Sequence, residues 1–515
     1  MRLSRASGSR LTVGGSAIAS PLSPRYFRLT AHSSVKVAMA TSSITEQPAG
    51  APTHQRRDRR RTLAAATICA GILISTLDLT IVNVAFPAIG ADFTDASVAD
   101  LSWILNGYAI VFAALLIPAG RFADRFGMKN VFMTGLGLFT VASGLCAVAG
   151  SVDALNAARL LQAVGAAALG PTSMGLLMVT YGAEQRAKAM RVWATASGVA
   201  AASGPLVGGV LVNVDWPWIF LVNLPIGVLA VIVGARVIAP GRHPSKERQP
   251  MPDLFGSALL AVAIGLLALG IVKAPDWGWG TGKVLGALVG SMILIAVLLF
   301  RSSRHTSPVI DLSLLRIRDF SMANVASAFY YVAFAAGVLS VSLWCQNVWG
   351  WSALATGMAM APGNLMLPFL SILSAKLVAK LGQVLSVVFG STVLAIGSAW
   401  WAVAVTVEPN YVWGMLPGVL LTRIGMGLSL APLMGASTRE LPATAVATGS
   451  GLNNMFRQVG FVLGVSLLIV IIGNPSDSEA ALTAYRAGWW FTAAASLAAS
   501  LTILALRIDR PKKNA

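Results

Sequence analysis

Long apolar runs, separated by short polar or charged stretches, recur along almost the whole chain after residue 61. Each run is close to the roughly 20 residues that a helix needs to cross the hydrocarbon core of a bilayer. Six runs form a first series and eight form a second, at 63–86, 98–119, 131–149, 155–181, 192–214 and 218–238, then 254–272, 284–300, 322–348, 354–378, 384–407, 412–434, 443–472 and 489–506. The pattern predicts an all-α integral membrane protein with about 14 transmembrane helices.

Composition and charge agree with a membrane protein. Of the residues, 56% are hydrophobic and 11% are charged, against roughly 25% charged in soluble domains. A pI near 10.5 is also typical of nucleic-acid binding, but the positions of the charges favour the positive-inside rule. Of 38 Lys and Arg residues, 32 fall in the N-terminal segment and alternate loops and 3 in the opposite loops, while Arg159, Arg423 and Arg457 fall inside runs. We therefore expect cytoplasmic termini, an even number of spans, a plasma-membrane location and no nucleic-acid partner.

Charged and proline-rich breaks divide the chain into segments. We expect a basic, disordered cytoplasmic tail (1–61), an N-terminal six-helix half (62–238), a cytoplasmic linker (239–253), two additional transmembrane helices (254–300), a second linker (301–320), a C-terminal six-helix half (321–507) and a cytoplasmic tail (508–515). The basic tail has three interpretations: contact with anionic lipid, a solvated tail, or translation from near Met39. No cleavable signal is evident.

A short charged stretch joins the second and third runs. It reads Gly120, Asp124, Arg125, Gly127 and Lys129 in the spacing G-x-x-x-D-R-x-G-x-K. Gly127 permits a tight turn, and Asp124 can accept from a helix N-terminus or an Arg. The stretch resembles the cytoplasmic signature loop of the major facilitator superfamily, although Phe122 stands where Leu is usual. An ordinary charged turn would explain the basic residues but not their combination with the glycines and the acid.

Glycine and proline crowd the fifth run, in the order Gly198, Gly204, Pro205, Gly208 and Gly209. Such residues persist in lipid where another helix packs closely. The spacing resembles the antiporter motif of drug exporters in the same superfamily. Close packing with no bearing on transport is the alternative. Leucine at position 204 or 205 should abolish export, and Gly209→Ala should be milder.

Asp78 is the only acid at membrane depth, where a lone charge is costly. Its surroundings, Leu77 to Pro87, resemble the signature of fourteen-span drug exporters, as does the corner Trp216 to Gly227, in which Pro217 replaces the common Arg. Arg159, Gln162 and Gly165 match the R-x-x-Q-x-x-G of related exporters. The resemblance implies that Asp78 and Arg159 carry proton coupling, since a nearby guanidinium favours the carboxylate and desolvation disfavours it. A purely structural tether is the alternative.

These motifs together identify the chain as similar to the drug:proton antiporters of the EmrB/QacA type. The resemblance implies a major facilitator fold arranged 6+2+6, and weak internal echoes, such as Arg423-Ile-Gly425 for the Arg159 segment, agree. It also implies export of amphipathic drugs, dyes or antibiotics by alternating access. Candidate residues of the substrate cavity are polar or aromatic: Asn83, Trp103, Tyr108, Gln162, Tyr330, Phe334, Asn454, Arg457 and Gln458.

Other chemistry has little support in the sequence. The three cysteines fall singly in apolar runs and the four histidines in the tail or cytoplasmic loops, so we expect no metal site. No phosphate-binding glycine loop occurs, and we expect no cofactor and a proton gradient as the energy source. We expect a monomer, small amphipathic substrates, protons and lipid as partners, and no enzyme activity. The single acid favours monovalent cations or neutral amphiphiles, although Arg423 and Arg457 would tolerate anions. Rival functions are export of one endogenous metabolite, lipid or siderophore on the same fold, a multipass membrane enzyme, and a sensor.

Overall fold

The computed structural model describes residues 54–182, 185–239, 251–306, 308–441 and 445–506. Within these ranges the chain is helical apart from short connections, and no strand occurs. This follows from a bilayer setting, because a helix pairs its backbone polar groups internally where no water can. The elements are α1 (His54–Asp92), α2 (Val98–Leu101), α3 (Trp103–Phe126), α4 (Met128–Ala147), α5 (Val152–Tyr181), α6 (Arg186–Val212), α7 (Trp218–Leu221), α8 (Asn223–Val237), α9 (Leu254–Val272), α10 (Ala274–Trp277), α11 (Gly282–Arg304), α12 (Leu312–Leu315), α13 (Arg318–Leu343), η2 (Trp344–Val348), α14 (Ala353–Ala404), η3 (Tyr411–Met415), α15 (Leu416–Thr438), α16 (Val446–Ile472) and α17 (Ser478–Leu504).

Two helices, α6 and α14, have unusual geometry. Among the described residues, 12 helices are long and apolar enough to span a membrane, and α6 makes a thirteenth when its segments Arg191–Ala201 and Ser203–Val212, bent by 42°, are taken as one. Helix α14 has 52 residues, which at about 1.5 Å per residue is far longer than a bilayer core. Its backbone is non-helical at Gly382, where φ is 82°. Two crossings joined at Gly382 agree with the predicted runs 354–378 and 384–407, and with about 14 helices in total.

Several helix ends differ from the predicted boundaries, and two of the differences change the interpretation of a segment. Helix α1 begins at His54, so residues 54–61, predicted as part of a disordered tail, are helical. Helix α3 continues to Phe126, α4 starts at Met128, and only Gly127, with φ of 93°, interrupts them. The predicted signature loop is therefore a one-residue turn between two helix ends. The rest of the tail (1–53), most of the first linker (240–250) and residues 508–515 lie outside the described residues.

Glycines bring helix backbones together at corresponding places in the two halves of the sequence. A Cβ on Gly165 of α5 would lie 2.6 Å from the Phe139 amide nitrogen and 2.7 Å from the Gly135 carbonyl oxygen on α4. In the same way, a Cβ on Gly425 of α15 would lie 2.5 Å from the Gly390 carbonyl oxygen on α14. When these glycines are matched, Arg423 falls one helical turn beyond the position of Arg159. The Arg423 segment and the Arg159 segment, although similar in sequence, therefore place their arginines at positions that are not equivalent.

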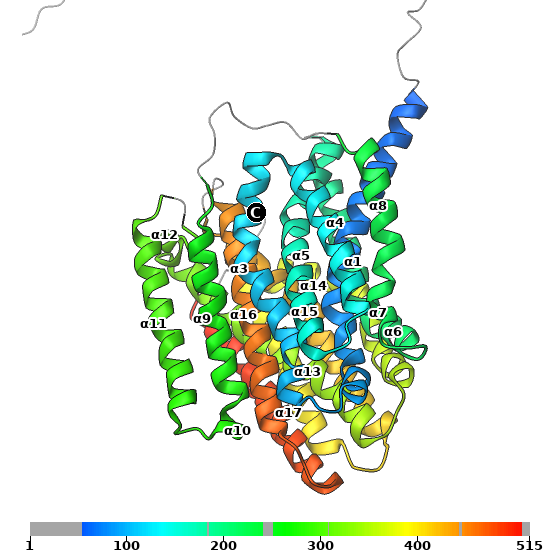
Figure 1. Cartoon of the computed structure of the whole chain (residues 1–515), viewed down its shortest axis with the longest axis vertical. Helices are drawn as coiled ribbons and strands as arrows, with labels where there is room; N and C mark the ends of the chain where they lie inside the picture. Colours follow the sequence, from blue (N-terminus) through cyan, green and yellow to red (C-terminus); the bar gives the residue numbers. More distant parts are fainter. Residues whose placement is uncertain (1–53, 183–184, 240–250, 307, 442–444, 507–515) are drawn as a thin grey trace, which may run out of the picture. The chain divides into compact units, whose positions relative to one another are not determined.

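Helices α9 and α11 pack against each other, and α9 also packs against α3 and α16 (Figure 1). Ion pairs occur at both ends of α9. Lys273 Nζ lies 2.8 Å from Asp100 Oδ1, and Arg301 of α11 pairs with Asp253, the N-cap of α9, at 2.9 Å. The pair α9 and α11 thus lies against one helix from each half of the sequence.

Candidate functional site

An ion pair between α1 and α5 forms the centre of the candidate site. Arg159 Nη1 lies 2.5 Å from Asp78 Oδ2, and the two side chains are 1% and 0% exposed. Arg159 Nε also donates to the Ile104 carbonyl of α3 at 3.2 Å. The predicted partners, 81 positions apart in the sequence, are in direct contact. A carboxylate and a guanidinium in this setting stabilise each other, and removal of either charge leaves the other buried and uncompensated.

Polar side chains from three helices complete this ion pair. Gln162 accepts from Arg159 Nη1 at 2.6 Å and donates to Asp78 Oδ1 and to Ser143 Oγ, each at 3.0 Å. Ser143 of α4 donates to the Phe220 carbonyl at 3.1 Å and accepts from Asn223 Nδ2 of α8 at 2.9 Å. The sequence analysis singled out Gln162 but missed Ser143 and Asn223. A serine and an asparagine inside apolar runs were the only signal, and such residues are common in packed membrane helices.

Tyr108 of α3 covers the ion pair from another side. The guanidinium carbon of Arg159 lies 4.0 Å from the centroid of the Tyr108 ring, a cation–π distance. Tyr108 is 1% exposed, so it contacts the charge network and does not line an open cavity in this conformation. The predicted role of Tyr108 in substrate contact therefore stays a prediction, and its observed neighbour is Arg159.

The glycines of the fifth run pack against α1 directly beyond Asp78. A Cβ on Gly204 would collide with the Thr80 side chain, and one on Gly208 would lie 2.9 Å from Ile81 Cγ1. Gly198 differs from them: it is exposed, and nothing lies within 4 Å of where its Cβ would be. The structure thus gives close contacts to Gly204 and Gly208 and none to Gly198.

The far end of the same glycine face meets the C-terminal half of the sequence. A Cβ on Gly209 would lie 2.6 Å from the Ala353 carbonyl oxygen and 2.9 Å from Leu354 Cα, at the start of α14. These are backbone atoms, which cannot rotate away. Even a single methyl group at position 209 therefore meets backbone, and our expectation that Gly209→Ala is milder than leucine at position 204 or 205 stays a prediction. Pro205 is part of the same contact, because its carbonyl oxygen faces Gly357 of α14.

Helix α1 also reaches the C-terminal half directly. The carbonyl of Asn83 accepts from Ser342 Oγ at 2.9 Å, and the carbonyl of Val84 accepts from Gln346 Nε2 at 3.0 Å. The Asn83 amide nitrogen donates back to the Leu79 carbonyl of its own helix at 3.3 Å. Asn83, predicted to line a cavity, is 2% exposed and lies at a contact between helices.

Residues of the signature stretch lie at the end of α3 and the start of α4. Lys129 Nζ donates to the Ala235 carbonyl of α8 at 2.9 Å, which satisfies a carbonyl at the end of that helix. Asp124 is exposed. Arg125 lies over the Phe126 ring, 5.7 Å from its centroid, and Gly127 supplies the turn. A Cβ on Gly120 would make only an ordinary contact, 3.8 Å from Pro171 Cβ. The interactions named here all stay within the N-terminal half.

The remaining cavity candidates divide into two groups. Tyr330, Phe334 and Arg457 gather around Tyr331: the Tyr331 ring centroid lies 5.7 Å from that of Tyr330 and 5.6 Å from that of Phe334, and Arg457 donates to the Tyr331 hydroxyl. The other group has no common site. Trp103 and Asn454 are half-buried and Gln458 is buried. None of the contacts described above links these three residues to the Tyr331 cluster.

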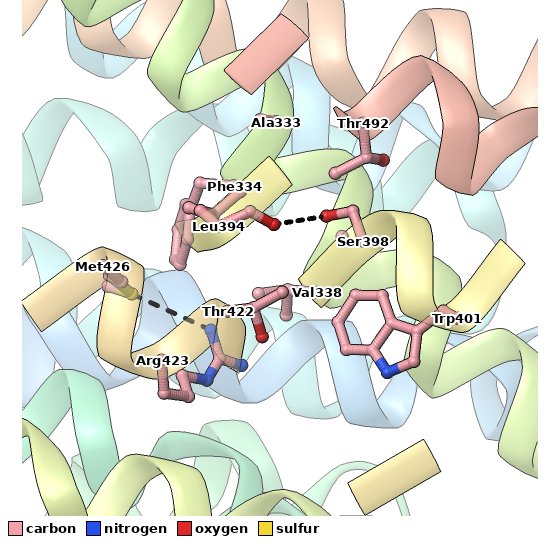
Figure 2. Close-up of a pocket in the computed structure, with 11 residues that line it drawn as sticks. Ala333, Phe334, Val338, Leu394, Ser398, Trp401, Thr422, Arg423, Met426 and Thr492 are labelled. Carbon is pink, nitrogen blue, oxygen red and sulfur yellow. Dashed lines mark hydrogen bonds between the residues drawn. The ribbon is translucent and has the colours of Figure 1, made fainter. Parts of the chain in front are cut away.

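A small cavity adjoins the Tyr331 cluster. It is lined by Phe334, Trp401, Thr422, Arg423, Met426 and Thr492 among others, and Figure 2 shows these side chains converging from several helices. Its volume of about 20 Å³ is enough for about one water molecule. The sequence analysis noted Arg423 as part of a weak internal repeat and did not predict that it lines a cavity.

The described part of the chain holds no group of three or more His, Cys, Asp or Glu residues that could bind a metal ion.

Comparison with known proteins gives the family. Residues 68–465 match the model of the Major Facilitator Superfamily. The chain is 33% identical over 413 residues to the "Tetracenomycin C resistance and export protein" of Streptomyces glaucescens, covering 79% of this chain and 75% of that protein. It is 31% identical over 435 residues to the "Methylenomycin A resistance protein" of Streptomyces coelicolor, with 84% and 90% covered.

Solved structures agree at the level of the fold. A bacterial homologue of the human drug peptide transporters PepT1 and PepT2 superposes with a TM-score of 0.61 at 16% identity, over 86% of this chain and 98% of that one. The human organic anion transporter MFSD10 gives a TM-score of 0.59 at 13% identity, over 86% and 99%. The helices, motifs and relatives together show that this multipass membrane protein is a transporter, not an enzyme, and that it belongs to the major facilitator superfamily, among relatives named for antibiotic resistance and export.

Proposed function

We propose that the protein exports amphipathic antibiotics or other drugs from the cytoplasm in exchange for protons. The observation that carries the proposal is the fully buried pair Asp78 and Arg159, because Asp78 is an acid buried inside an apolar run, where a charge is costly. The names of the relatives, among them a cephamycin export protein of Amycolatopsis lactamdurans at 29% identity, support antibiotics as the class of substrate.

Protonation of Asp78 is the proposed switch. A neutral carboxylic acid no longer compensates the Arg159 guanidinium, and a lone buried cation costs several kcal/mol. The conformation described here is therefore the one that an ionised Asp78 favours. A second conformation, in which Arg159 reaches other acceptors or water, becomes favourable when Asp78 takes up a proton.

A path of contacts connects this switch to the other half of the chain. Thr80 and Ile81, one turn or less from Asp78, lie against Gly204 and Gly208 of α6, and Gly209 of α6 lies against the start of α14. Movement of α1 therefore displaces α6 and also, through Asn83 and Val84, α13 and η2. These contacts are at the ends of α6 and α14 that we predict to face outward, which supports a cycle that closes and opens that side.

The wider organisation is part of the same proposal. We infer a 6+2+6 arrangement with cytoplasmic termini in the plasma membrane, a monomer, and the proton gradient as energy source. The packing of α9 and α11 outside α3 and α16 supports two additional helices. The distribution of Lys and Arg supports the orientation.

Asp78→Asn tests the coupling. The substrate is the compound for which overexpression raises resistance most in a panel of dyes and antibiotics. In inverted vesicles with an imposed pH gradient, wild type should release protons when this compound is added, whereas Asp78→Asn should bind the compound and release none, since amide cannot carry the proton. Asp124→Asn, at an exposed acid, is the control and should slow the cycle without uncoupling it. Near wild-type proton release by Asp78→Asn, at equal abundance in the membrane, would refute the proposed coupling site.

A further inference from the structure

Arg423 is a buried cation without a carboxylate partner. Its side chain is 8% exposed, and no ion pair between described residues includes it. Its Nη1 lies 3.8 Å from the Met426 sulfur, a weak acceptor, and its Nε has no hydrogen-bond partner. Arg159, which is 1% exposed, has a carboxylate, an amide and a carbonyl around it. The two buried arginines therefore have opposite electrostatic surroundings.

The C-terminal half offers no acid that could neutralise Arg423 inside the membrane. Between residues 321 and 507 the acidic residues are Glu408, Glu440, Asp477 and Glu479. All of them lie in connections or in the first turn of α17. An uncompensated buried cation is strongly unfavourable, so its retention calls for an anionic partner that the chain itself does not provide.

The cavity beside Arg423 has the size and the walls for one end of such a partner. Figure 2 shows the guanidinium beside the cavity, with Phe334 and Trp401 among the apolar walls and the hydroxyl of Thr422 nearby. A volume of about 20 Å³ suits the oxygen atoms of a carboxylate or a phenolate and not a whole drug molecule. Aromatic walls suit a flat apolar body.

A second arginine adds to the positive potential of this region. The guanidinium carbon of Arg457 lies 4.5 Å from the centroid of the Tyr331 ring, and that ring contacts Phe334 of the cavity wall. In the N-terminal half, by contrast, Asp78 is already neutralised by Arg159. The interior charge left to attract a ligand is positive.

We propose that Arg423 anchors a subsite for organic anions, namely carboxylates or phenolates carried on an aromatic body. This rests on the proposed function as an exporter and names the substrate class as organic anions, in place of the monovalent cations or neutral amphiphiles that the single acid favoured. The planar guanidinium forms two parallel hydrogen bonds to a carboxylate, and in the proposed transport cycle the helices that carry Phe334 and Trp401 separate to admit the ring system.

The test compares two ligands of one shape on the purified full-length protein. The probes are 2-naphthoate and the neutral 2-naphthamide, with binding measured by calorimetry. Wild type should bind the anion about tenfold or more tightly than the amide, as expected for a charged hydrogen bond. Arg423→Gln should reduce this ratio to near one, and Arg423→Lys should retain part of it. Arg486→Gln, a half-buried arginine of α17 outside the cavity, is the matched control and should keep the wild-type ratio.

A second measurement needs no variant. Phenylglyoxal modifies accessible arginines, and peptide mass spectrometry should show that 2-naphthoate protects Arg423 while 2-naphthamide does not. Equal binding of the two probes to wild type, no binding of either, or an unchanged ratio in Arg423→Gln overturns the subsite. The proposed function can fail while the subsite stands. This is the outcome if vesicles show no proton-coupled export of any compound while the protein still binds 2-naphthoate more tightly than 2-naphthamide.

Discussion

Gly209→Ala is expected to weaken the contact between α6 and α14 more than alanine at Gly198, Gly204 or Gly208 of the same helix, since only Gly209 faces α14. The added Cβ would lie 2.6 Å from the Ala353 carbonyl oxygen and 2.9 Å from Leu354 Cα, whereas ordinary van der Waals contact begins at 3.4 Å. Both neighbours are backbone, so the two helices must separate by several tenths of an ångström. Overpacking of this kind costs about 1–3 kcal/mol.

The cost of Gly209→Ala falls on the conformation in which α6 and α14 touch. If a second conformation separates these helix ends, the same 1–3 kcal/mol shifts the balance between the two by roughly 5- to 150-fold. Gly198→Ala is the matched control, because it lies on the same helix and its Cβ meets nothing within 4 Å. It should be neutral, or stabilising by up to about 1 kcal/mol from helix propensity.

Two assays distinguish these outcomes. Thermal unfolding of the purified proteins should give a lower midpoint for Gly209→Ala than for Gly198→Ala. Labelling by an impermeant maleimide of a cysteine at Val207, in a background without the three native cysteines, should be faster with Gly209→Ala, because Val207 is partly buried beside the contact. Equal midpoints and equal labelling rates in the two variants would refute the reasoning.

Three further predictions follow from other contacts. Gly165→Ala and Gly425→Ala should each destabilise the protein by about 1–3 kcal/mol in thermal unfolding, because the added Cβ would lie 2.5–2.7 Å from backbone atoms. Gly137→Ala is the control, because a Cβ there lies in open space on α4. Equal unfolding midpoints in the three variants would contradict the packing argument. Burial raises the pKa of Asp253, but hydrogen bonds from Arg301 and the Gly256 amide outweigh burial and hold the pKa below its ordinary value. The ionised carboxylate therefore stabilises the fold above about pH 4, and this stabilisation is lost as the pH falls through the lowered pKa. Asp253→Asn retains a capping oxygen and should lower the free energy of unfolding by roughly 1 kcal/mol at neutral pH, a small loss because Arg301 is 34% exposed. The difference in melting temperature between wild type and Asp253→Asn should vanish in acid. A difference that is independent of pH would refute this role of Asp253. Reporter fusions after Ser43, within 239–253 and at Ala515 should all report the cytoplasm, and strong activity of a periplasmic reporter at any of them would remove the predicted topology.

The positions of the helices could be read from the sequence because lipid imposes a local rule. An apolar run of about 20 residues must pair its own backbone, whatever surrounds it, and the described helices occupy the predicted runs with shifted ends. The length of an apolar run does not determine where a helix ends outside the bilayer. Polar residues such as Arg121 and Asp124 can continue a helix there, and α3 continues until Gly127.

The candidate site was only partly readable for the same reason. A lone acid among apolar residues has to be compensated, which marked Asp78, and the spacing after Arg159 matched a family motif. Nothing local to α1 or α5 points to Ser143 on α4 or Asn223 on α8, because hydroxyl and amide side chains occur throughout packed membrane helices.

Only the tertiary structure separates residues that look alike in the sequence. Gly198 and Gly209 belong to one motif, yet one faces open space and the other a backbone carbonyl, because the neighbour comes from α14, far along the chain. Arg159 and Arg423 are both arginines inside apolar runs, yet one meets a carboxylate and the other a thioether. The sequence determines which segments enter the bilayer through local transfer free energy, whereas the chemistry of each buried group depends on which distant helix packs against it.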